Sequence, residues 1–283
     1  MAATRIDLHT HSSCSDGTDS PEQLMVLAAQ TGLNVIALTD HDTFAGITAA
    51  SKMVPECGVT LVPGVEISTS HQGITAHLLA YLPDLKSQVL PDLFEKNVQA
   101  RQQRMREMVQ RLSADFNISY QAVAEQAGSS PIGRPHIADL LVKAGYFPNR
   151  SAAFEQVLAT SSKYYVHYQS PDTIYAVEQV VKAGGVPVLA HPRAGGRHRR
   201  FLSAATIVEL KAAGLFALEA YHPEQTSAEQ EEVVQIAQDL GLAVTGSSDY
   251  HGSGKPNKLG QCLTDPDVFA EICSRGEGEL VRS

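Results

Sequence analysis

The chain alternates between short apolar runs and longer stretches with a helical spacing of apolar residues. Seven runs have the pattern of strands, namely residues 5–11, 35–39, 59–67, 73–82, 186–190, 215–220 and 243–248. A helix is predicted after the first run, where Ser20 can cap it, Pro21 occupies its first position and Gly32 closes it. Strands that alternate with helices predict a parallel sheet. A helix is likewise expected over residues 42–54.

Residues 86–168 break this alternation because they contain helical patterns only. The predicted helices cover residues 90–112, 119–126, 134–144 and 151–158. A long helical stretch between barrel strands is typical of an insertion that carries function. We therefore expect a barrel domain of residues 1–85 and 169–283 and an inserted helical cap of residues 86–168 over its site.

The composition is that of an ordinary globular protein. Of 283 residues, 43% are hydrophobic and 19% are charged, and no apolar run approaches the roughly 20 residues of a membrane span. The start at Met1 shows no apolar signal segment, so a cytoplasmic location is expected. The four cysteines, Cys14, Cys57, Cys262 and Cys273, form no C-x-x-C pair and are expected to be free thiols.

The formal charge of −9 argues against binding to duplex nucleic acid, because such binding depends on neutralisation of phosphates by Lys and Arg. This charge does not exclude small anionic substrates, because bound divalent ions reverse the local electrostatic field of an acidic site. No membrane or protein partner is indicated by the sequence.

Residues able to bind metal stand in or directly after the predicted strands. His9 and His11 lie on one face of an extended strand because strand side chains repeat every two residues. The carboxyl ends of parallel barrel strands form one face, where the remaining ligands should meet them. The full set is His9, His11, Asp16, His41, Glu66, His77, His191, Asp249 and His251.

Imidazole and carboxylate ligands in this number predict two or three divalent ions, with Mn, Fe or Zn the candidates and Glu66 the candidate bridge. For His77, which lies inside an apolar strand, a core histidine is the alternative. Asp40 and Asp42 are expected to orient His41 or to cap the following helix. Cys14 is interpreted as a bystander in the metal-binding turn and as an oxidation-sensitive position.

These motifs, in this order and over nearly the whole chain, resemble the polymerase and histidinol phosphatase (PHP) family of metal-dependent phosphoesterases. The resemblance implies a seven-stranded distorted (βα) barrel. It also implies one ion held by His9, His11, Glu66 and Asp249. A second ion would be held by Glu66, His77 and His191, and a third by Asp16, His41 and His251.

The expected chemistry is attack on phosphorus by a metal-bridged hydroxide, which needs no side-chain nucleophile. The sequence contains no G-x-S-x-G motif, and Gly252–Lys255 lacks the spacing of a phosphate-binding loop, so a flexible active-site loop is expected there.

Several cationic or imidazole side chains are candidates for contact with the substrate. The segment containing Arg134 and His136 resembles the Arg-x-His segment that contacts phosphate in the nucleotide-hydrolysing branch of the family, at a predicted helix start. Arg193 is a candidate by position, and His222 is expected to bind phosphate, to protonate the leaving oxygen, or to be structural. Asp249, His222 and Arg134 are the expected catalytic residues.

Two further basic segments are weaker candidates. Residues 195–200 are either an anion-collecting loop or a solvated patch, with the patch favoured. Arg101, Arg104, Arg106 and Arg111 suit an exposed helix face.

The function that this pattern favours is hydrolysis of a phosphomonoester on a small nucleotide. The resemblance points to the 3′-phosphate of a nucleoside 3′,5′-bisphosphate, with a 5′-monophosphate such as AMP as the product. The alternatives are 5′-to-3′ trimming of short RNA and hydrolysis of histidinol phosphate. A metal or nucleotide sensor is the alternative without catalysis.

Overall fold

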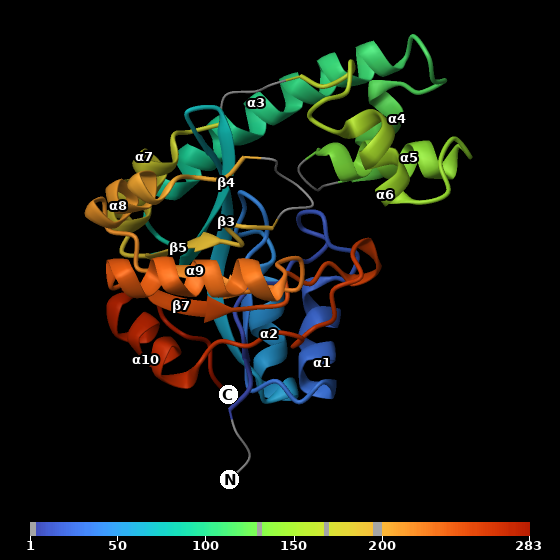
Figure 1. Cartoon of the computed structure of the whole chain (residues 1–283). Helices are drawn as coiled ribbons and strands as arrows, with labels where there is room; N and C mark the ends of the chain where they lie inside the picture. The colour runs from blue at the N-terminus through green and yellow to red at the C-terminus, as the bar shows by residue number, and fades with distance from the viewer. Residues whose placement is uncertain (1–3, 129–131, 167–169, 195–199) are drawn as a thin grey trace. The chain divides into compact units, whose positions relative to one another are not determined.

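A computed structural model describes residues 4–128, 132–166, 170–194 and 200–283 (Figure 1). The chain forms two compact units. The first consists of Met1–Phe94 with Pro171–Ser283, and the second of Glu95–Ser170. In the described residues, the first unit contains one seven-stranded sheet whose strand order in space equals the order along the chain.

The strands are β1 (Ile6–Asp7), β2 (Val35–Leu38), β3 (Thr60–His71), β4 (Ile74–Tyr81), β5 (Val186–Ala190), β6 (Ala217–Tyr221) and β7 (Ala243–Gly246). β2 and β5 are buried along their whole length, as expected for strands covered on both faces. Beyond the named strands, Thr10 bridges Tyr250 in parallel, and the His11 N–H donates to the Tyr250 carbonyl at 2.9 Å. The segments after the first and last strands therefore meet, and the sheet nearly closes into the distorted βα barrel that the family resemblance implies.

The expectation of a parallel sheet is wrong for one strand. β1, β2 and β3 pair in parallel and so do β5, β6 and β7, but β4 is antiparallel to both of its neighbours, β3 and β5. The cause is a two-residue turn at Gln72 and Gly73, whose φ angles of 49° and 75° suit a tight hairpin. The amino-terminal half of β4 consequently lies at the face formed by the carboxyl ends of the other strands.

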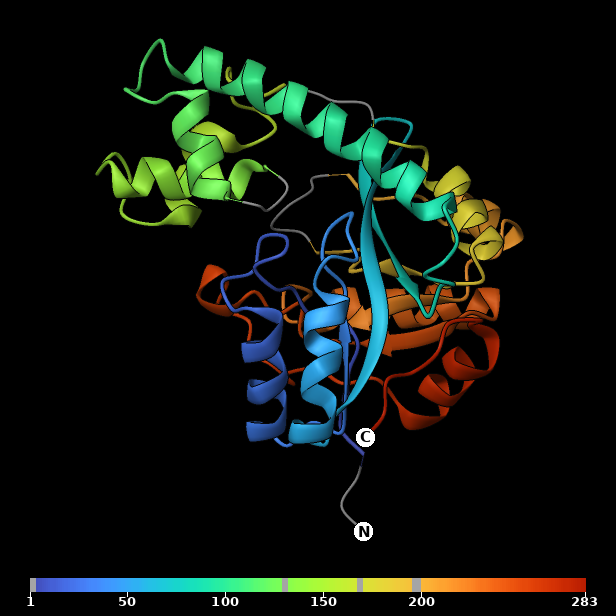
Figure 2. The same cartoon turned by 180° about the vertical axis from the view of Figure 1, so that it is seen from behind.

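Helices cover the barrel. They are α1 (Pro21–Gln30), α2 (Ile47–Cys57), α7 (Thr173–Lys182), α8 (Ala204–Ala212), α9 (Ser227–Leu240) and α10 (Pro266–Arg275), with a short η2 (Gly252–Gly254). α1 and α2 lie side by side, as do α7 and α8 (Figures 1 and 2). α1 begins with the predicted Ser20 cap, which accepts a hydrogen bond from the Gln23 backbone. α2 begins at Ile47 rather than at residue 42, because Asp42 adopts a left-handed φ of 51° and residues 42–46 form a turn.

The second unit is helical in its described part. It contains most of α3 (Val89–Leu112), then α4 (Tyr120–Ala127), α5 (Arg134–Lys143), α6 (Arg150–Ala153) and a π-helical turn η1 (Phe154–Leu158). Its own core includes Met105 and Met108 of α3 with Val123 of α4 and Leu141 of α5. α4, α5 and α6 pack together beside the second half of α3 (Figures 1 and 2).

α3 contributes to both cores. Leu90, Leu93 and Phe94 pack in the barrel core, so the barrel unit extends further along this helix than residue 85. Among the described helices, none is long and apolar enough to cross a bilayer.

Candidate metal centre

Glu66, in the middle of β3, is the point at which the candidate ligands meet. It is almost fully buried, and each of its two oxygens faces a different set of imidazole nitrogens. The first oxygen, Oε2, lies 3.1 Å from His9 Nε2, 3.0 Å from His11 Nε2 and 3.3 Å from His41 Nε2. A carboxylate that offers one oxygen to each side is the usual bridge between two metal ions.

The second oxygen of Glu66, Oε1, lies 2.8 Å from His77 Nδ1 and 3.1 Å from His191 Nε2. The antiparallel direction of β4 places His77 here, since it pairs with Ser68 of β3 and with Ala190 at the end of β5. The ligand atoms of His41, Glu66 and His77 also lie within 4.8 Å of one another. His41 is therefore near two groups, although the resemblance assigns it to the third ion only.

The innermost group has the spacing expected of a bound ion. His9 Nε2 and His11 Nε2 are 3.1 Å apart, and Asp249 Oδ1 is 3.4 Å from each of them. Ligand atoms held at ~2.0–2.1 Å from one tetrahedral ion are separated from each other by about 3.3 Å. His9, His11, Glu66 and Asp249 thus offer four ligand atoms at the edges of such a polyhedron.

A third group lies beside the second ring nitrogen of His11. Asp16 Oδ1 is 3.2 Å from His251 Nε2 and 3.8 Å from His11 Nδ1, and Asp16 Oδ2 is 4.0 Å from His41 Nε2. All four residues offer a ligand atom within 4.8 Å of the others. The structure therefore brings together all nine residues that the sequence marks as candidate ligands.

Two buried atoms of these groups support the fit of a cation. Within the described residues, His77 Nδ1 and Asp16 Oδ1 are buried without a hydrogen bond, although each lies close to another ligand atom. Close approach without hydrogen-bond geometry is what donors that share an ion show, because each lone pair points at the ion and not at its neighbour.

Electrostatics separates the imidazoles into two kinds. Burial lowers the pKa of His191 to about 4 and that of His251 to about 4, so both rings are neutral and ready to bind an ion at pH 7. For His11, burial acts in the same direction, but Asp249 and Glu66 outweigh it and raise the pKa to about 9. His11 must therefore lose a proton to become a ligand.

Two buried acids that are not among the candidate ligands, Asp40 and Asp42, hold the loops that follow the strands. Asp40 accepts hydrogen bonds from the Ser12 N–H at 2.8 Å, from Ser12 Oγ at 2.6 Å and from Ser15 Oγ at 2.6 Å. It thereby fixes the turn between His11 and Asp16. Asp42 accepts a hydrogen bond from the Ser68 N–H at 3.1 Å. No side chain caps α2, so the alternative that one of these acids caps this helix is wrong.

His222 meets the other oxygen of Asp249. Its Nδ1 accepts a hydrogen bond from the Glu224 N–H at 3.1 Å, so a neutral ring carries its proton on Nε2. That atom lies 3.2 Å from Asp249 Oδ2. Lys255 also reaches this oxygen, with its Nζ at 2.5 Å. The loop after His251 thus places a cation at the centre, which the sequence analysis did not predict.

Glu219, in β6, is a second residue that the sequence analysis missed. It is fully buried and contacts His9 and the backbone of His191. The signal was present, because a charged residue in the apolar run 215–220 requires partners inside the barrel.

The other predicted contact residues lie elsewhere in the described chain. The side chain of Arg193 is directed to α9, where its Nε donates to Glu232 at 2.8 Å. Arg134 and His136 belong to the second unit. Arg134 donates to the Leu158 carbonyl at 3.0 Å, and His136 Nδ1 accepts from the Gly133 N–H at 3.0 Å. Their contact with substrate remains a prediction.

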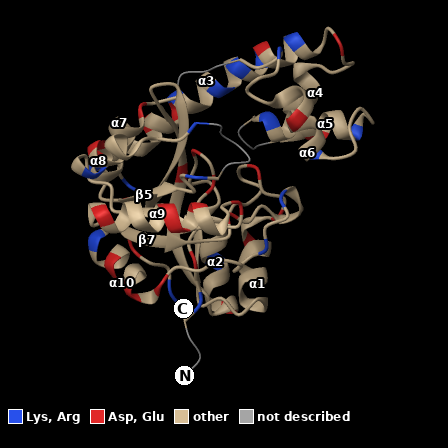
Figure 3. Ribbon diagram, viewed as in Figure 1, with Lys and Arg blue, Asp and Glu red and all other residues tan. Residues whose placement is uncertain are grey.

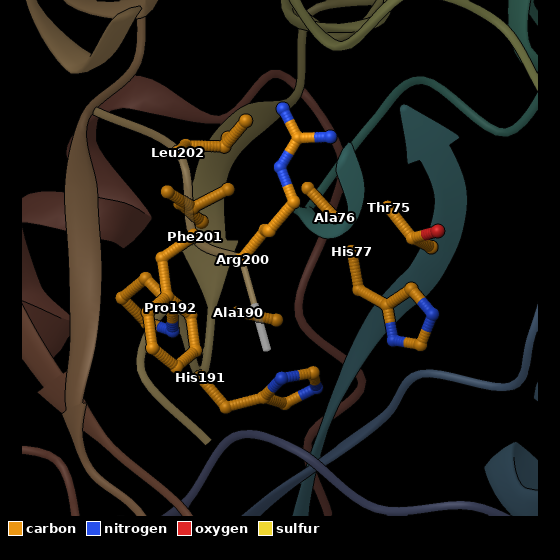
Figure 4. Close-up of a pocket in the computed structure, with 10 residues that line it drawn as sticks. Thr75, Ala76, His77, Ala190, His191, Pro192, Arg200, Phe201 and Leu202 are labelled. Atoms are coloured by element: carbon orange, nitrogen blue, oxygen red, sulfur yellow. The ribbon is translucent and has the colours of Figure 1, made fainter. Parts of the chain in front are cut away.

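A small pocket adjoins two candidate metal ligands, His77 of β4 and His191 after β5. Figure 4 shows the rings of His77 and His191 on one side of it and the guanidinium of Arg200 directed away from them. Its remaining lining residues are Thr75, Ala76, Leu189, Ala190, Pro192, Phe201 and Leu202. Arg200 is exposed at this pocket, and residues 195–199 of the predicted basic patch lie outside the described residues. The four cysteines are free thiols, as predicted.

Fold and site together define a metal-dependent phosphoesterase, and comparison with known proteins identifies the family. The PHP domain model matches residues 7–168, so the chain belongs to the PHP family. A crystal structure from Bifidobacterium adolescentis, assigned as a metal-dependent phosphoesterase, superposes with a TM-score of 0.93 at 40% identity and covers 98% of this chain and 97% of that one.

Two curated relatives carry names that specify activities. A 5′-3′ exoribonuclease of Haemophilus influenzae is 32% identical over 248 residues, which are 87% of this chain and 90% of the relative. A 3′,5′-nucleoside bisphosphate phosphatase of Chromobacterium violaceum is 29% identical over 282 residues, 98% of each chain. The chain is therefore similar over most of its length to phosphoesterases with different substrates.

Proposed function

We propose that this phosphoesterase removes the 3′-phosphate of a nucleoside 3′,5′-bisphosphate and releases a 5′-monophosphate such as AMP. The observation that carries the proposal is the group of ligands around Glu66, which suits a pair of ions at one phosphate. The match to the Chromobacterium violaceum phosphatase along 98% of both chains supports the choice of substrate.

The residues around Glu66 fit two or three divalent ions, for which Mn, Fe and Zn are the candidates. Such ions, when bound, supply a hydroxide at neutral pH and neutralise charge on the phosphoryl oxygens. Their holders would be His9, His11, Glu66 and Asp249 for the first, Glu66, His77 and His191 for the second, and Asp16, His41 and His251 for the third.

Other residues would act on the substrate directly. His222 holds a proton on Nε2 beside Asp249, so it can donate to the departing ribose oxygen. Lys255, with its ammonium at the same carboxylate, adds positive charge where a phosphoryl group would bind. Arg134 and His136, at the start of α5, would bind the phosphate that is not transferred. Arg193 is the remaining candidate for that role.

One observation favours short RNA as a second candidate substrate. The second unit, Glu95–Ser170, contains nine Lys and Arg against six Asp and Glu and has a net charge of +3. The rest of the chain contains 13 Lys and Arg against 25 Asp and Glu and has a net charge of −12. Lys and Arg residues lie along α3 (Figure 3). The guanidinium carbon of Arg106 lies over the Tyr120 ring, 4.2 Å from its centroid. Cations interleaved with aromatic rings are typical of surfaces that bind single strands.

The test is turnover with Mn, Fe or Zn supplied separately and with three substrates side by side. These are adenosine 3′,5′-bisphosphate, histidinol phosphate and a 5′-phosphorylated short RNA. We expect preference for the bisphosphate with AMP as the product. Progressive release of mononucleotides from RNA would instead establish an exonuclease, and bound metal without turnover of any substrate would establish a sensor.

A further inference from the structure

Glu219 occupies an unusual place for an acid, in the middle of the apolar strand β6. It is fully buried and lies opposite Thr245 of β7 in the sheet register. It is absent from the nine ligands of the ion groups described above, and the family resemblance assigns it no role. A buried carboxylate needs strong hydrogen bonds, and Glu219 has them from two metal-ligand residues.

The first partner is the ring of His9. Its Nδ1 lies 3.0 Å from Glu219 Oε1 and 3.3 Å from Oε2, whereas its Nε2 belongs to the innermost ligand group. A histidine can bind an ion through Nε2 only if the ring proton sits on Nδ1. An acceptor at Nδ1 therefore selects the form of His9 that binds metal.

The second partner is the main chain of His191. Its N–H donates to Glu219 Oε2 at 2.9 Å. His191 has a φ of 29°, in the left-handed region that residues with a Cβ avoid. Its Nε2 lies 3.1 Å from Glu66 Oε1, on the side of the second predicted ion. The hydrogen bond to Glu219 stabilises this strained backbone conformation and so fixes the position of the His191 Cα, from which the imidazole extends.

We propose that Glu219 is a positioning residue that acts on two predicted ion sites at once, through the tautomer of His9 and through the backbone of His191. The inference rests on the metal dependence of the proposed function but not on the choice of substrate. One carboxylate of β6 thereby contacts predicted ligands that follow β1 and β5, and its loss should weaken the binding of both ions together.

Metal binding to Glu219→Gln tests the proposal. Glutamine has the same shape, but an amino group that only donates replaces one of the two acceptor oxygens. If this group faces His9 Nδ1 it favours the tautomer that cannot bind through Nε2, and if it faces the His191 N–H that hydrogen bond is lost. Zinc affinity is measured by competition with a chelator, and zinc stoichiometry by elemental analysis of the loaded protein. We expect an unchanged number of bound ions and an affinity lowered about tenfold or more at two sites, because partners of ligand histidines contribute that much. The third site should keep its affinity.

Glu231→Gln is the matched control, since it makes the same change at an exposed position of α9. It should bind zinc as the unaltered protein does. If Glu219→Gln loses one ion completely, Glu219 is itself a ligand and the proposal fails. Unchanged affinity at every site would also overturn it. Neither result depends on which substrate is hydrolysed, so failure of the substrate assignment is distinguishable.

A second measurement needs no variant and remains valid if Glu219→Gln does not fold. Zinc-loaded protein labelled with nitrogen-15 histidine reports the protonated nitrogen of each ring by NMR. We expect His9 to carry a slowly exchanging proton on Nδ1 and none on Nε2. A His9 ring with its proton on Nε2, or with a rapidly exchanging Nδ1 proton, would contradict the proposal.

Discussion

At the residue scale, the arrangement around Glu66 makes the candidate ligands depend on one another. His9 and His11 face one oxygen of this carboxylate, and His77 and His191 face the other. Loss of one ligand therefore disturbs more than one ion group. Substitutions here should be judged by metal content as well as by rate, because a lower rate alone does not separate the two effects.

Substitution of Asp249 is the most direct test of the proposed metal centre. Asp249→Asn keeps the size of the side chain and tolerates the left-handed φ of 51°, but it removes the charge that faces His9 and His11. We expect zinc content and turnover to fall together, with kcat/KM lowered at least about a hundredfold. Elemental analysis and steady-state kinetics measure both quantities.

The control for this change is Asp239→Asn, at an exposed position of α9. It should keep both metal content and rate. Full turnover by Asp249→Asn would refute the assignment of Asp249 to the metal centre.

Cys262 allows a prediction about pH. Burial raises the pKa of its thiol to about 11, with the carboxylates of Asp7 and Glu219 acting in the same direction. The reactive thiolate therefore stays a minor species below that pH, and its fraction grows tenfold with each pH unit. We expect alkylation of Cys262 in the native protein to accelerate in this way from pH 7 to 10 without levelling off.

Peptide-resolved mass spectrometry measures the rate at Cys262 separately from the other cysteines. The same cysteine in denatured protein serves as the reference, because an ordinary thiol with a pKa of about 8.5 reaches its maximal rate near pH 10. A native rate that levels off near pH 9 would show that the thiol is not perturbed.

Most of the residues that the sequence predicted for the site follow strand ends in a recognisable spacing. His9, His11 and Asp249 belong to this class. Glu219 and Lys255 do not, because a single acid in a strand and a lysine in a loop have many ordinary explanations. Their roles depend on which distant side chain they face, which no local pattern contains.

At the element scale, β4 shows how one turn alters a site. Because the hairpin at Gln72 and Gly73 reverses the chain, His77 reaches the ligand face from the amino-terminal half of its strand. The sequence placed His77 in the site through the series of strands, although the direction assumed for that strand was wrong. The Gln-Gly pair was the available signal, but it is weaker than the Asn-Gly pair that marks such turns.

The predicted phosphate-binding residue Arg134 lies at the start of α5. Arg134→Gln should raise KM for adenosine 3′,5′-bisphosphate about tenfold with little change in kcat, because a charge-assisted hydrogen bond to the non-transferred phosphate is lost. Steady-state kinetics with and without the 5′-phosphate on the substrate measures the effect.

Lys143→Gln removes a charge from the exposed last turn of the same helix and should leave KM unchanged. Since Arg134 also bonds Leu158 and lies over the ring of Phe154, the melting temperature of each variant is compared first. An unaltered KM in a stable Arg134→Gln protein would assign this arginine to the fold of its unit.

At the scale of the whole molecule, each of the two units has a core of its own, and the candidate metal ligands found among the described residues lie in the barrel unit. The barrel was predictable because buried parallel strands appear as continuous apolar runs between helices. The limits of the insertion were harder to predict, because α3 has one unbroken helical pattern. Leu90 and Phe94 of this helix nevertheless pack in the barrel core, whereas Met105 and Met108 pack in the core of the second unit.

Removal of metal should therefore act on the barrel. An ion present at a hundred times its Kd stabilises the native state by about 2.7 kcal/mol, which corresponds to roughly 5–11 °C in Tm for a domain of this size. We expect chelation to lower the Tm by at least this amount and readdition of zinc to restore it. Differential scanning calorimetry measures the shift.

The second unit provides an internal control, because its described core contains none of the nine ligands. If it melts as a separate transition, that transition should not move with zinc. Equal Tm values with and without metal would show that the ligand groups hold no ion in the native state.

The insertion also has a consequence for synthesis on the ribosome. β4 ends at Tyr81 and its neighbour β5 begins only at Val186. At elongation rates of ~5–20 residues per second, the hydrogen-bonding edge of β4 waits about 5–20 s for its partner. During that interval the nascent barrel is a half-sheet with an open edge, the kind of surface that invites pairing with other chains. The helical unit is made in the same interval, so it can fold before the barrel closes.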